Sequence, residues 1–475
     1  MRDFLSFFSH RMALPVIAAV YTLWHLCVGW LADFPLYGDE AQYWVWGKNL
    51  DFGYYSKPPL IGWILGLFTA LFGDTPFAVR IPVLFAHLIT GYGLYRFACD
   101  HKHSSSVAAF IFLAYLSMPG VSFSSHIIST DPIVLSCWAW AMVWGYRFIC
   151  APNLKSASWL GIILGVGLLA KYAMIWFVVM FPVVLWLLHM QIHVHSVGRY
   201  IPWIVILMFL IISPNIYWNY TQAWPTFAHT ANNIGGWKGL NISNALIFLI
   251  TQVGILGPIV AVGGVVHARR VLWREDVRFS LGFSLPVLGV IVVQALVNRS
   301  HGNWAAIAHV GMVYVCVCGL LESHQWLRRG VIVNLVMAVL MGGVSIAARY
   351  HFLPHGINPY QRFYRGTRIL DALEAQKITL HDKVLVCDGR QLVAQLMYQL
   401  RNSTAIVVRY NPDNEPLDYF GMNTDMHVEP HKNRIFIGPT CLVEKQRDDM
   451  GVLIRDFSLV LGKPFKPLCL QEYRP

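Results

Sequence analysis

The sequence predicts a polytopic α-helical membrane protein of about eleven transmembrane helices with a small C-terminal α/β domain. Of its 475 residues, 56% are hydrophobic and only 13% are charged, and the mean hydropathy is +0.50. These values lie far from those of a soluble enzyme of this length. The long apolar runs stop near Tyr350. We therefore expect a membrane domain over residues 1–349 and a separate domain over residues 350–475.

The first hydrophobic segment, residues 12–32, follows Arg2 and Arg11 and could be a signal peptide. It is too long for a typical signal-peptide core and has no clean small-x-small cleavage site, so we expect an uncleaved spanning helix. The later apolar runs predict ten further spans, at 81–98, 105–120, 132–149, 157–170, 173–189, 200–213, 244–266, 279–297, 305–321 and 330–347.

The short segment 58–73 could either cross the membrane or lie along its surface. If it does not cross, the basic inter-helix loops fall on one side together with Arg2 and Arg11, as the positive-inside rule requires. We therefore expect a juxtamembrane helix there and a cytoplasmic amino terminus. The same rule explains the formal charge of +11 better than nucleic-acid binding does, because the basic residues are dispersed rather than clustered. Those loop residues are Arg96, Lys102, Arg147, Lys155, Arg269, Arg270, Arg274, Arg328 and Arg329.

This topology places the segments 33–80, 121–131, 214–243 and 298–304 on the periplasmic face, together with the C-terminal domain. Ionisable residues at a membrane boundary are costly and indicate function. Because so many polar residues collect on one face, we expect a single site there. They are Asp39, Glu40, Lys57, Arg80, His126, Asp131, Lys171, His229, Lys238, Arg299, His301 and Asn303.

Each position also has a purely structural interpretation. The aromatic residues of the first loop could simply sit at the level of the lipid headgroups. Asp131 precedes Pro132 and could cap a helix. The side chain of Lys171 could extend so that its ammonium group reaches the membrane–water interface, and His229 could be an ordinary loop histidine. The remaining positions could be helix-end anchors or interfacial caps: Arg80, Asn303 and Trp304.

Several motifs resemble the bacterial glycosyltransferase C superfamily. They are Gly-Asp-Glu-Ala-Gln-Tyr-Trp at 38–44, Tyr-Tyr-Ser-Lys-Pro-Pro-Leu-Ile-Gly-Trp at 54–63, Ser-Thr-Asp-Pro at 129–132, Pro-Asn-Ile-Tyr-Trp-Asn at 214–219 with Thr-Phe-Ala-His at 226–229, and His-Gly-Asn-Trp at 301–304. The resemblance covers about residues 12–321. Within the superfamily it is strongest to the polyprenyl-phosphate-sugar transferases akin to the lipid A aminoarabinose transferase and the protein O-mannosyltransferases.

The resemblance assigns roles to four residues. Asp39 matches the first-loop acid that orients or deprotonates the acceptor, and Asp131 matches the second outer-loop acid. Lys57 matches a lysine that meets the donor phosphate, and Lys171 matches a second basic position near it.

A divalent metal is the one cofactor that the resemblance suggests. His229 is similar to a metal-binding histidine of the aminoarabinose transferase. The other ligand of that relative is an acid immediately before the matching lysine, where this chain has Ser56. The resemblance therefore supplies only one of the two metal ligands of that relative. The sequence has no Walker or Rossmann glycine pattern that would bind a nucleotide cofactor.

The chemistry of such a reaction supports these assignments independently. The enzyme must stabilise the negative charge that grows on the phosphate as the glycosidic bond breaks, and lysines do so as point charges. An acceptor hydroxyl needs a nearby base, whereas an acceptor phosphate needs only to be oriented. Direct displacement predicts inversion at the anomeric carbon.

The donor-phosphate candidates are Lys57 and Lys171, then Arg80 and Arg299. The base candidates are Asp39, then Asp131 and Glu40. The candidates for acceptor or sugar contacts are Tyr55, Asn303 and Trp304.

The C-terminal domain shows strand-like runs at 383–387, 405–408 and 434–438, and a helical pattern at 390–400. It could be a structural cap, or it could help to admit or select the acceptor. Three of the nine cysteines fall on the outer side, which permits one disulfide and one free thiol without fixing the pairing. They are Cys387, Cys441 and Cys469.

We therefore expect an inner-membrane glycosyltransferase. Its predicted reaction moves a sugar from an undecaprenyl-phosphate-type donor to a lipid acceptor, such as lipid A or lipopolysaccharide, or to a glycan at the periplasmic face. One alternative is a protein O-mannosyltransferase, which needs a peptide-accepting groove. Another is a transporter or flippase for a lipid-linked sugar, which predicts internal repeats with interrupted helices. We recognise no such repeats in the sequence.

Overall fold

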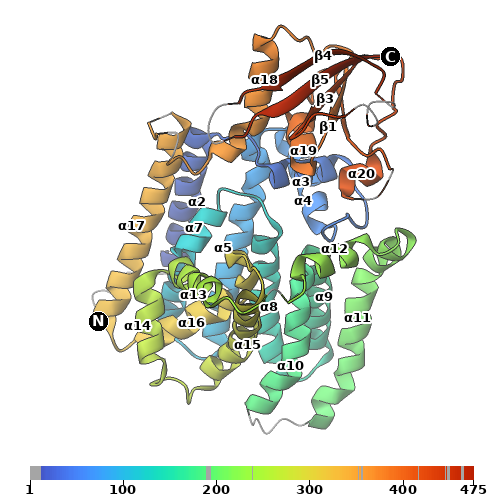
Figure 1. The fold of residues 1–475 in the computed structure, drawn as a ribbon. Helices are drawn as coiled ribbons and strands as arrows, with labels where there is room; N and C mark the ends of the chain where they lie inside the picture. Colours follow the sequence, from blue (N-terminus) through green and yellow to red (C-terminus); the bar gives the residue numbers. More distant parts are fainter. Residues whose placement is uncertain are drawn as a thin grey trace. The chain divides into compact units, whose positions relative to one another are not determined.

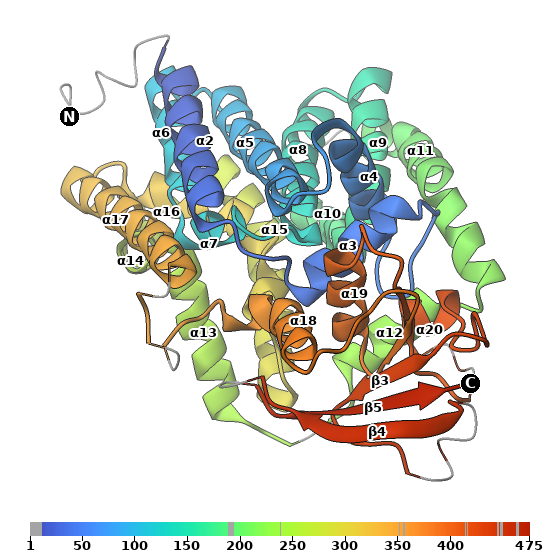
Figure 2. The same cartoon turned by 90° about the horizontal axis from the view of Figure 1, so that it is seen from above.

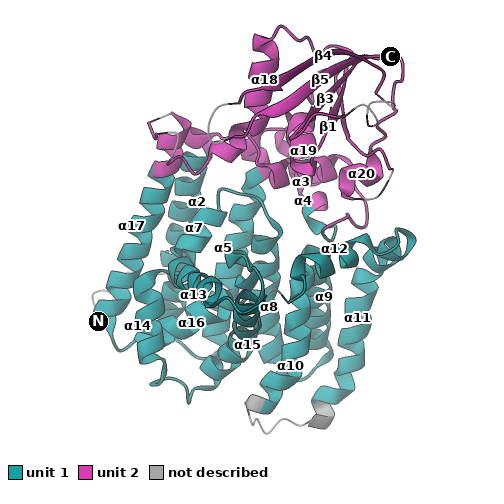
Figure 3. Ribbon diagram, viewed as in Figure 1, with its two compact units in different colours: residues 1–29, 57–61, 80–343 teal, residues 30–56, 62–79, 344–475 magenta. Residues whose placement is uncertain are grey.

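The computed structural model folds into two compact units (Figure 3). It describes residues 12–188, 194–237, 239–350, 352–354, 357–413, 415, 417–443, 446, 450–461 and 465–475. Unit 1 contains Met1–Gly29, Lys57–Ile61 and Arg80–Gly343, and unit 2 contains Trp30–Ser56, Gly62–Val79 and Val344–Pro475. Arg2, Arg11, Lys238 and the end of the expected span 173–189 lie outside the described residues.

The helices of unit 1 run mostly alongside one another, as Figure 1 shows. The strongest packing brings α9 against both α8 and α11, and α16 against both α14 and α15. In chain order the helices of the membrane part are α2 (Ala13–Ala32), α5 (Pro76–Asp100), α6 (Ser105–Leu116), α7 (Pro119–Ser124), α8 (Thr130–Cys150), α9 (Leu154–Ala170), η1 (Tyr172–Met174), α10 (Ile175–Leu187), α11 (Val194–Thr221), α12 (Pro225–Ile234), α13 (Ile242–Leu256), α14 (Pro258–Ala268), α15 (Glu275–Val297), η2 (Gly302–Ala305), α16 (Ala308–Leu320) and α17 (His324–Arg349).

Six helices in the described part of the chain are long and apolar enough to cross a membrane, namely α2, α5, α8, α11, α15 and α17. The pair α13 and α14 gives a seventh if it is one bent span. Four shorter apolar helices, α6, α9, α10 and α16, coincide with the remaining expected spans. A polytopic membrane protein is confirmed, and the count of eleven crossings stays a prediction. The segment 58–73 forms α4 (Leu60–Phe72), which has only 13 residues.

The expected continuous span at 244–266 is wrong in one respect, because it is bent by 100° between α13 and α14. Gly257 stands at the break with φ +93°, in the left-handed region that favours glycine, and Pro258 opens the next helix. A Cβ atom on Gly257 would lie only 1.8 Å from Oδ1 of Asn334. Both the backbone conformation and the close approach of α17 therefore require glycine at the bend.

Unit 2 contains a five-stranded sheet in the order β2-β1-β3-β5-β4 (Figures 1 and 2). Strand β1 pairs parallel with β2 and β3, and β5 pairs antiparallel with β3 and β4. The three predicted strands and the predicted helix are confirmed. The elements are α3 (Gly38–Lys48), α4, η3 (Gln361–Tyr364), α18 (Arg365–Ala375), β1 (Val384–Cys387), α19 (Arg390–Gln399), β2 (Ile406–Arg409), α20 (Tyr419–Asn423), β3 (Arg434–Gly438), β4 (Val452–Leu459) and β5 (Leu468–Arg474).

A disulfide joins Cys441 to Cys469 on β5, and Cys387 remains a buried free thiol at the end of β1. One disulfide and one free thiol is the arrangement that the cysteine count permitted. The apolar core beneath the sheet is formed by residues such as Val386 and Phe436, which alternate with residues of the opposite face.

Candidate active site

Three of the predicted site residues meet in unit 1. Asp131 lies in the first turn of α8, Lys171 ends α9, and Asn303 lies in η2. Lys171 Nζ donates to Asp131 Oδ1 at 2.5 Å, and Asn303 Nδ2 donates to Asp131 Oδ2 at 2.9 Å. The side chains of Asp131 and Lys171 are only 13% and 19% exposed. Both carboxylate oxygens are therefore engaged, and the pair is largely withdrawn from water.

This geometry suits Lys171 for holding an anion better than it suits Asp131 for taking a proton. An ammonium group has three donors, of which Asp131 accepts one. The partly buried setting strengthens the attraction between the ammonium group and a further anion. Lys57 is half-buried, and its charge also acts on the Asp131 carboxylate. The sequence predicted that both lysines serve the donor phosphate, and the structure brings their charges to the same carboxylate.

The other basic candidates of unit 1 have different surroundings. Arg80 lies on α5, and its charge acts on His126 in the loop before α8. Arg299 is exposed in the segment after α15. Trp304 lies in η2 beside Asn303, with its ring edge-on to His301 at 5.4 Å between centroids. The roles of Arg80, Arg299 and Trp304 in binding a ligand stay predictions.

The suggested metal ligand His229 lies on α12, where Asn233 Nδ2 donates to its Nε2 atom at 2.8 Å. Within the described ranges, two groups of three His, Cys, Asp or Glu residues are close enough to hold a metal, and neither contains His229. One group is His103, Asp276 and Cys318, where Arg274 Nη2 already donates to Asp276 Oδ2 at 2.6 Å. The other group includes the two disulfide cysteines.

Unit 2 holds the remaining candidates. Asp39 lies in the first turn of α3, and its side chain is 39% exposed, with Oδ1 3.1 Å from Arg390 Nη1. Glu40 is fully buried, and its Oε2 atom accepts the backbone N–H of Tyr37 at 3.0 Å. That bond caps the amino end of α3. Of the two acids, Asp39 is the one that solvent and a substrate can reach.

Tyr55 lies in the segment after α3 and is partly buried. Its burial, and then the charge of Asp418, raise the pKa of its hydroxyl group. A phenol that stays protonated is a hydrogen-bond donor at every physiological pH, which suits the predicted contact with a sugar or acceptor oxygen.

Arg390 is the site residue that sequence reasoning missed. An arginine in a helix is unremarkable, but it follows the buried strand β1 directly, within Cys-Asp-Gly-Arg at 387–390. Ligands of open α/β sheets bind outside the carboxyl ends of parallel strands. That rule could have drawn attention to this residue.

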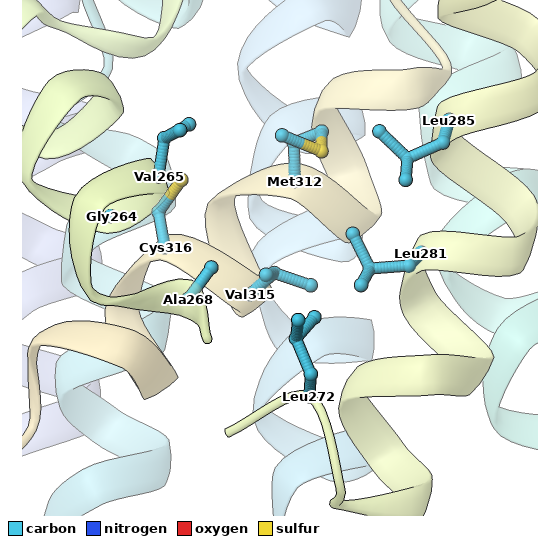
Figure 4. A pocket seen from close by; sticks show the side chains of 9 residues that line it. All are labelled: Gly264, Val265, Ala268, Leu272, Leu281, Leu285, Met312, Val315 and Cys316. Carbon is cyan, nitrogen blue, oxygen red and sulfur yellow. The ribbon is translucent and has the colours of Figure 1, made fainter. Parts of the chain in front are cut away.

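A pocket of about 180 Å³ lies between α14, α15 and α16 (Figure 4). Its lining is apolar and includes Val265, Leu281, Met312 and Cys316. None of the predicted site residues lines it. It has no polar group that could orient a sugar, so we assign it to helix packing.

Acidification is expected to lower the stability of the folded protein through His126, which lies in the loop before α8. Burial, and then the charge of Arg80, lower the pKa of His126 from 6.5 to about 4, and its Nε2 atom lies 3.0 Å from Nδ1 of His25. Because the folded pKa is depressed, the contribution of neutral His126 to stability is complete above pH 6.5. It is lost as the pH falls toward about 4.

Thermal unfolding measured across this pH range tests the prediction. The parent protein should lose stability more steeply toward acid than a His126→Asn variant, whose amide does not titrate. Equal slopes for the two proteins would refute the assignment.

Comparisons with known proteins show which proteins this chain is similar to. Residues 56–218 match the family model described as dolichyl-phosphate-mannose-protein mannosyltransferase. The chain is 28% identical over 420 residues to the lipid A galacturonosyltransferase RgtD of Rhizobium johnstonii, which covers 87% of each chain. It is 31% identical over 133 residues to the undecaprenyl phosphate-alpha-4-amino-4-deoxy-L-arabinose arabinosyl transferase of Photorhabdus laumondii, over 27% of this chain and 24% of that protein.

Solved structures show the same fold. The crystal structure of ArnT from Cupriavidus metallidurans in the apo state aligns with a TM-score of 0.67 at 13% identity, over 96% of this chain and 97% of that chain. The structure of the same protein bound to undecaprenyl phosphate aligns with a TM-score of 0.63 at 14% identity, over 98% of each chain. The predicted fold, a polytopic α-helical membrane domain with a small C-terminal α/β domain, is therefore confirmed, and the count of eleven crossings stays a prediction.

Proposed function

Since the chain belongs to the glycosyltransferase C superfamily, in its aminoarabinose transferase-like group, we propose that it transfers a sugar from an undecaprenyl-phosphate donor to lipid A. One observation carries the choice of acceptor. Similarity to the lipid A galacturonosyltransferase extends over 87% of both chains, and so includes membrane and C-terminal parts. The protein mannosyltransferase model matches only residues 56–218.

In the proposed reaction, the bond between the anomeric carbon and the donor phosphate oxygen breaks, and the acceptor oxygen bonds to the same carbon from the opposite face. The leaving group is undecaprenyl phosphate, whose growing charge Lys57 and Lys171 stabilise. The fixed Asp131 and Asn303 hold Lys171 in place before the donor arrives, so little reorganisation is needed. Inversion at the anomeric carbon follows.

Asp39 acts on the acceptor in this proposal. If the acceptor is a hydroxyl group, Asp39 takes its proton as the new bond forms. If the acceptor is a phosphate of lipid A, that phosphate is already nucleophilic and Asp39 orients it. The proposed reaction assigns no role to a metal ion, because His229 bonds to Asn233 and Ser56 stands where the relative has an acid.

We place the reaction at the periplasmic face of the bacterial inner membrane. Two observations support this orientation. The basic inter-helix loops would then share the cytoplasmic side, and the Cys441–Cys469 disulfide of unit 2 suits an oxidising compartment. We also propose that residues 1–349 form the transmembrane catalytic domain and that residues 350–475 form a periplasmic domain.

The second candidate function is protein O-mannosyl transfer, which the family-model match over residues 56–218 favours. A transporter has less support, because each of the named relatives is a transferase.

Purified protein in liposomes tests the proposal. The donor would be undecaprenyl phosphate carrying galacturonic acid, aminoarabinose or mannose, and the acceptor lipid A or a serine- and threonine-rich peptide. We expect lipid A to gain one sugar for each undecaprenyl phosphate released. A glycosylated peptide with unchanged lipid A would establish the mannosyltransferase alternative. Donor that crosses the bilayer without any glycosylated product would establish a transporter.

A further inference from the structure

Unit 2 packs the helix that carries Asp39 directly against a helix of the C-terminal segment. Helices α3 and α19 are in close contact (Figures 1 and 2). A Cβ atom on Gly38 would lie 2.7 Å from Cβ of Gln391, so the backbone of α3 can approach α19 only with glycine there. At the far end of the contact, the rings of Trp44 and Tyr398 pack edge to face at 5.1 Å between centroids.

Arg390 stands at the first position of α19, where this packing brings it to the Asp39 carboxylate. Its Nη1 atom donates to Oε1 of Gln42 at 2.7 Å and lies 3.1 Å from Oδ1 of Asp39. Asp39 and Gln42 are three residues apart on α3, so both side chains lie on one face of the helix. Gln42 is only 2% exposed and is thus a fixed anchor for the guanidinium group.

We propose that Arg390 is a positioning residue for Asp39, so that the C-terminal segment takes part in the transfer reaction. The inference rests on the proposed function, in which Asp39 acts on the acceptor. The guanidinium group is a rigid planar fork. Its Nη1 atom is held by Gln42 and faces Oδ1 of Asp39, so the positive charge stays at a fixed place beside the carboxylate.

The ion pair between Arg390 and Asp39 is expected to contribute little to the free energy of unfolding. Both side chains are 39% exposed, and exposed ion pairs contribute on average little to folding. The ion pair itself therefore contributes little to the fold. Arg390→Ala also removes the donor to the buried Gln42 oxygen, so the free energy of unfolding of this variant is measured alongside its kcat. By contrast, a misplacement of about 1 Å at a reacting group can cost about 100-fold in rate.

The test compares steady-state transfer by Arg390→Ala and Arg390→Lys. We expect the alanine variant to lose about 10- to 100-fold in kcat, with the KM for the lipid-linked donor unchanged. The lysine variant should recover only part of the rate, because an ammonium group on a flexible stem keeps the charge but is less well fixed beside Asp39 than the planar guanidinium group. Added guanidinium ion should raise the rate of Arg390→Ala and leave that of the parent unchanged.

Arg401 provides a matched control. It follows the other end of α19, where its Nη1 atom donates to the carbonyl oxygen of Tyr398 at 2.7 Å. Arg401→Gln should keep the parental rate. If Arg401→Gln is as slow as Arg390→Ala and guanidinium restores neither, Arg390 is merely structural and the inference fails.

The Asp39→Asn variant separates the two claims. If Asp39→Asn is inactive while Arg390→Ala keeps its kcat within twofold of the parent, the inference fails and the proposed function stands. If Asp39→Asn keeps the parental rate of transfer, the inference and the proposed role of Asp39 fail, whereas the transfer reaction stands. If neither the parent nor any variant glycosylates lipid A, the proposed function fails.

Discussion

Replacing Asp39 with asparagine is expected to lower kcat about 100- to 10,000-fold, the range that a positioned acid or base contributes. Asparagine keeps the size of the side chain but removes its charge and its capacity to accept a proton. The donor phosphate is bound by other residues in our proposal, so donor affinity should change little. Single-turnover transfer, measured together with equilibrium binding of undecaprenyl phosphate, separates the two quantities.

Asp51 offers the matched control for this variant. It is a second acid within residues 33–80, and its Oδ1 atom accepts the backbone N–H of Phe52 at 2.7 Å. Asp51→Asn should retain the parental rate. An Asp39→Asn variant with more than about a tenth of parental kcat would be inconsistent with general acid–base or orienting catalysis by Asp39.

Replacing Lys171 with methionine is expected to reduce both stability and donor binding. Loss of the ammonium group leaves the Asp131 carboxylate, 13% exposed, without its ion-pair partner. Breaking such a pair costs about 3 kcal/mol of unfolding free energy, the lower end of the range for buried pairs. Donor affinity should fall as well, because one of the two proposed phosphate-binding cations is gone.

The double variant Lys171→Met with Asp131→Asn distinguishes these effects. It removes both charges, so most of the stability should return, while donor binding and transfer should stay low. Denaturant unfolding in detergent and binding of undecaprenyl phosphate measure the two separately. Lys48→Met is the control, since the Lys48–Asp74 pair at 2.6 Å is 36% and 34% exposed and should cost no more than about 1 kcal/mol. Recovery of donor binding in the double variant would refute the phosphate role of Lys171.

Hydrophobic patterning was sufficient to predict much of the fold. Long apolar runs predicted the helices of the membrane part, and the short strand-like runs at 383–387 and 434–438 predicted β1 and β3. The 100° bend at Gly257 was not predicted, because a Gly-Pro pair within an apolar run is also compatible with a kinked continuous helix. The partner of Gly257, Asn334, lies 77 residues further along the chain (334 − 257), beyond the reach of any local pattern.

The candidate site was predictable only as a set of residues on one face. Motifs drew attention to Asp131, Lys171 and Asn303, but the contacts between them join positions 40 and 172 residues apart. No periodicity encodes such distances. Arg390 lies 351 residues beyond Asp39 (390 − 39), and helix packing alone brings the two together. Tertiary structure was therefore needed to identify the partner of the acid that the sequence emphasised most.

The most direct measurement is mass spectrometry of lipid A from cells that contain the protein, lack it, or carry the Asp39→Asn variant at equal protein level. Our account predicts that one lipid A species loses a single sugar mass when the protein is absent, and that Asp39→Asn reproduces this loss. The account would be contradicted if lipid A were identical in all three strains and the strain without the protein held a lipid-linked sugar confined to one leaflet.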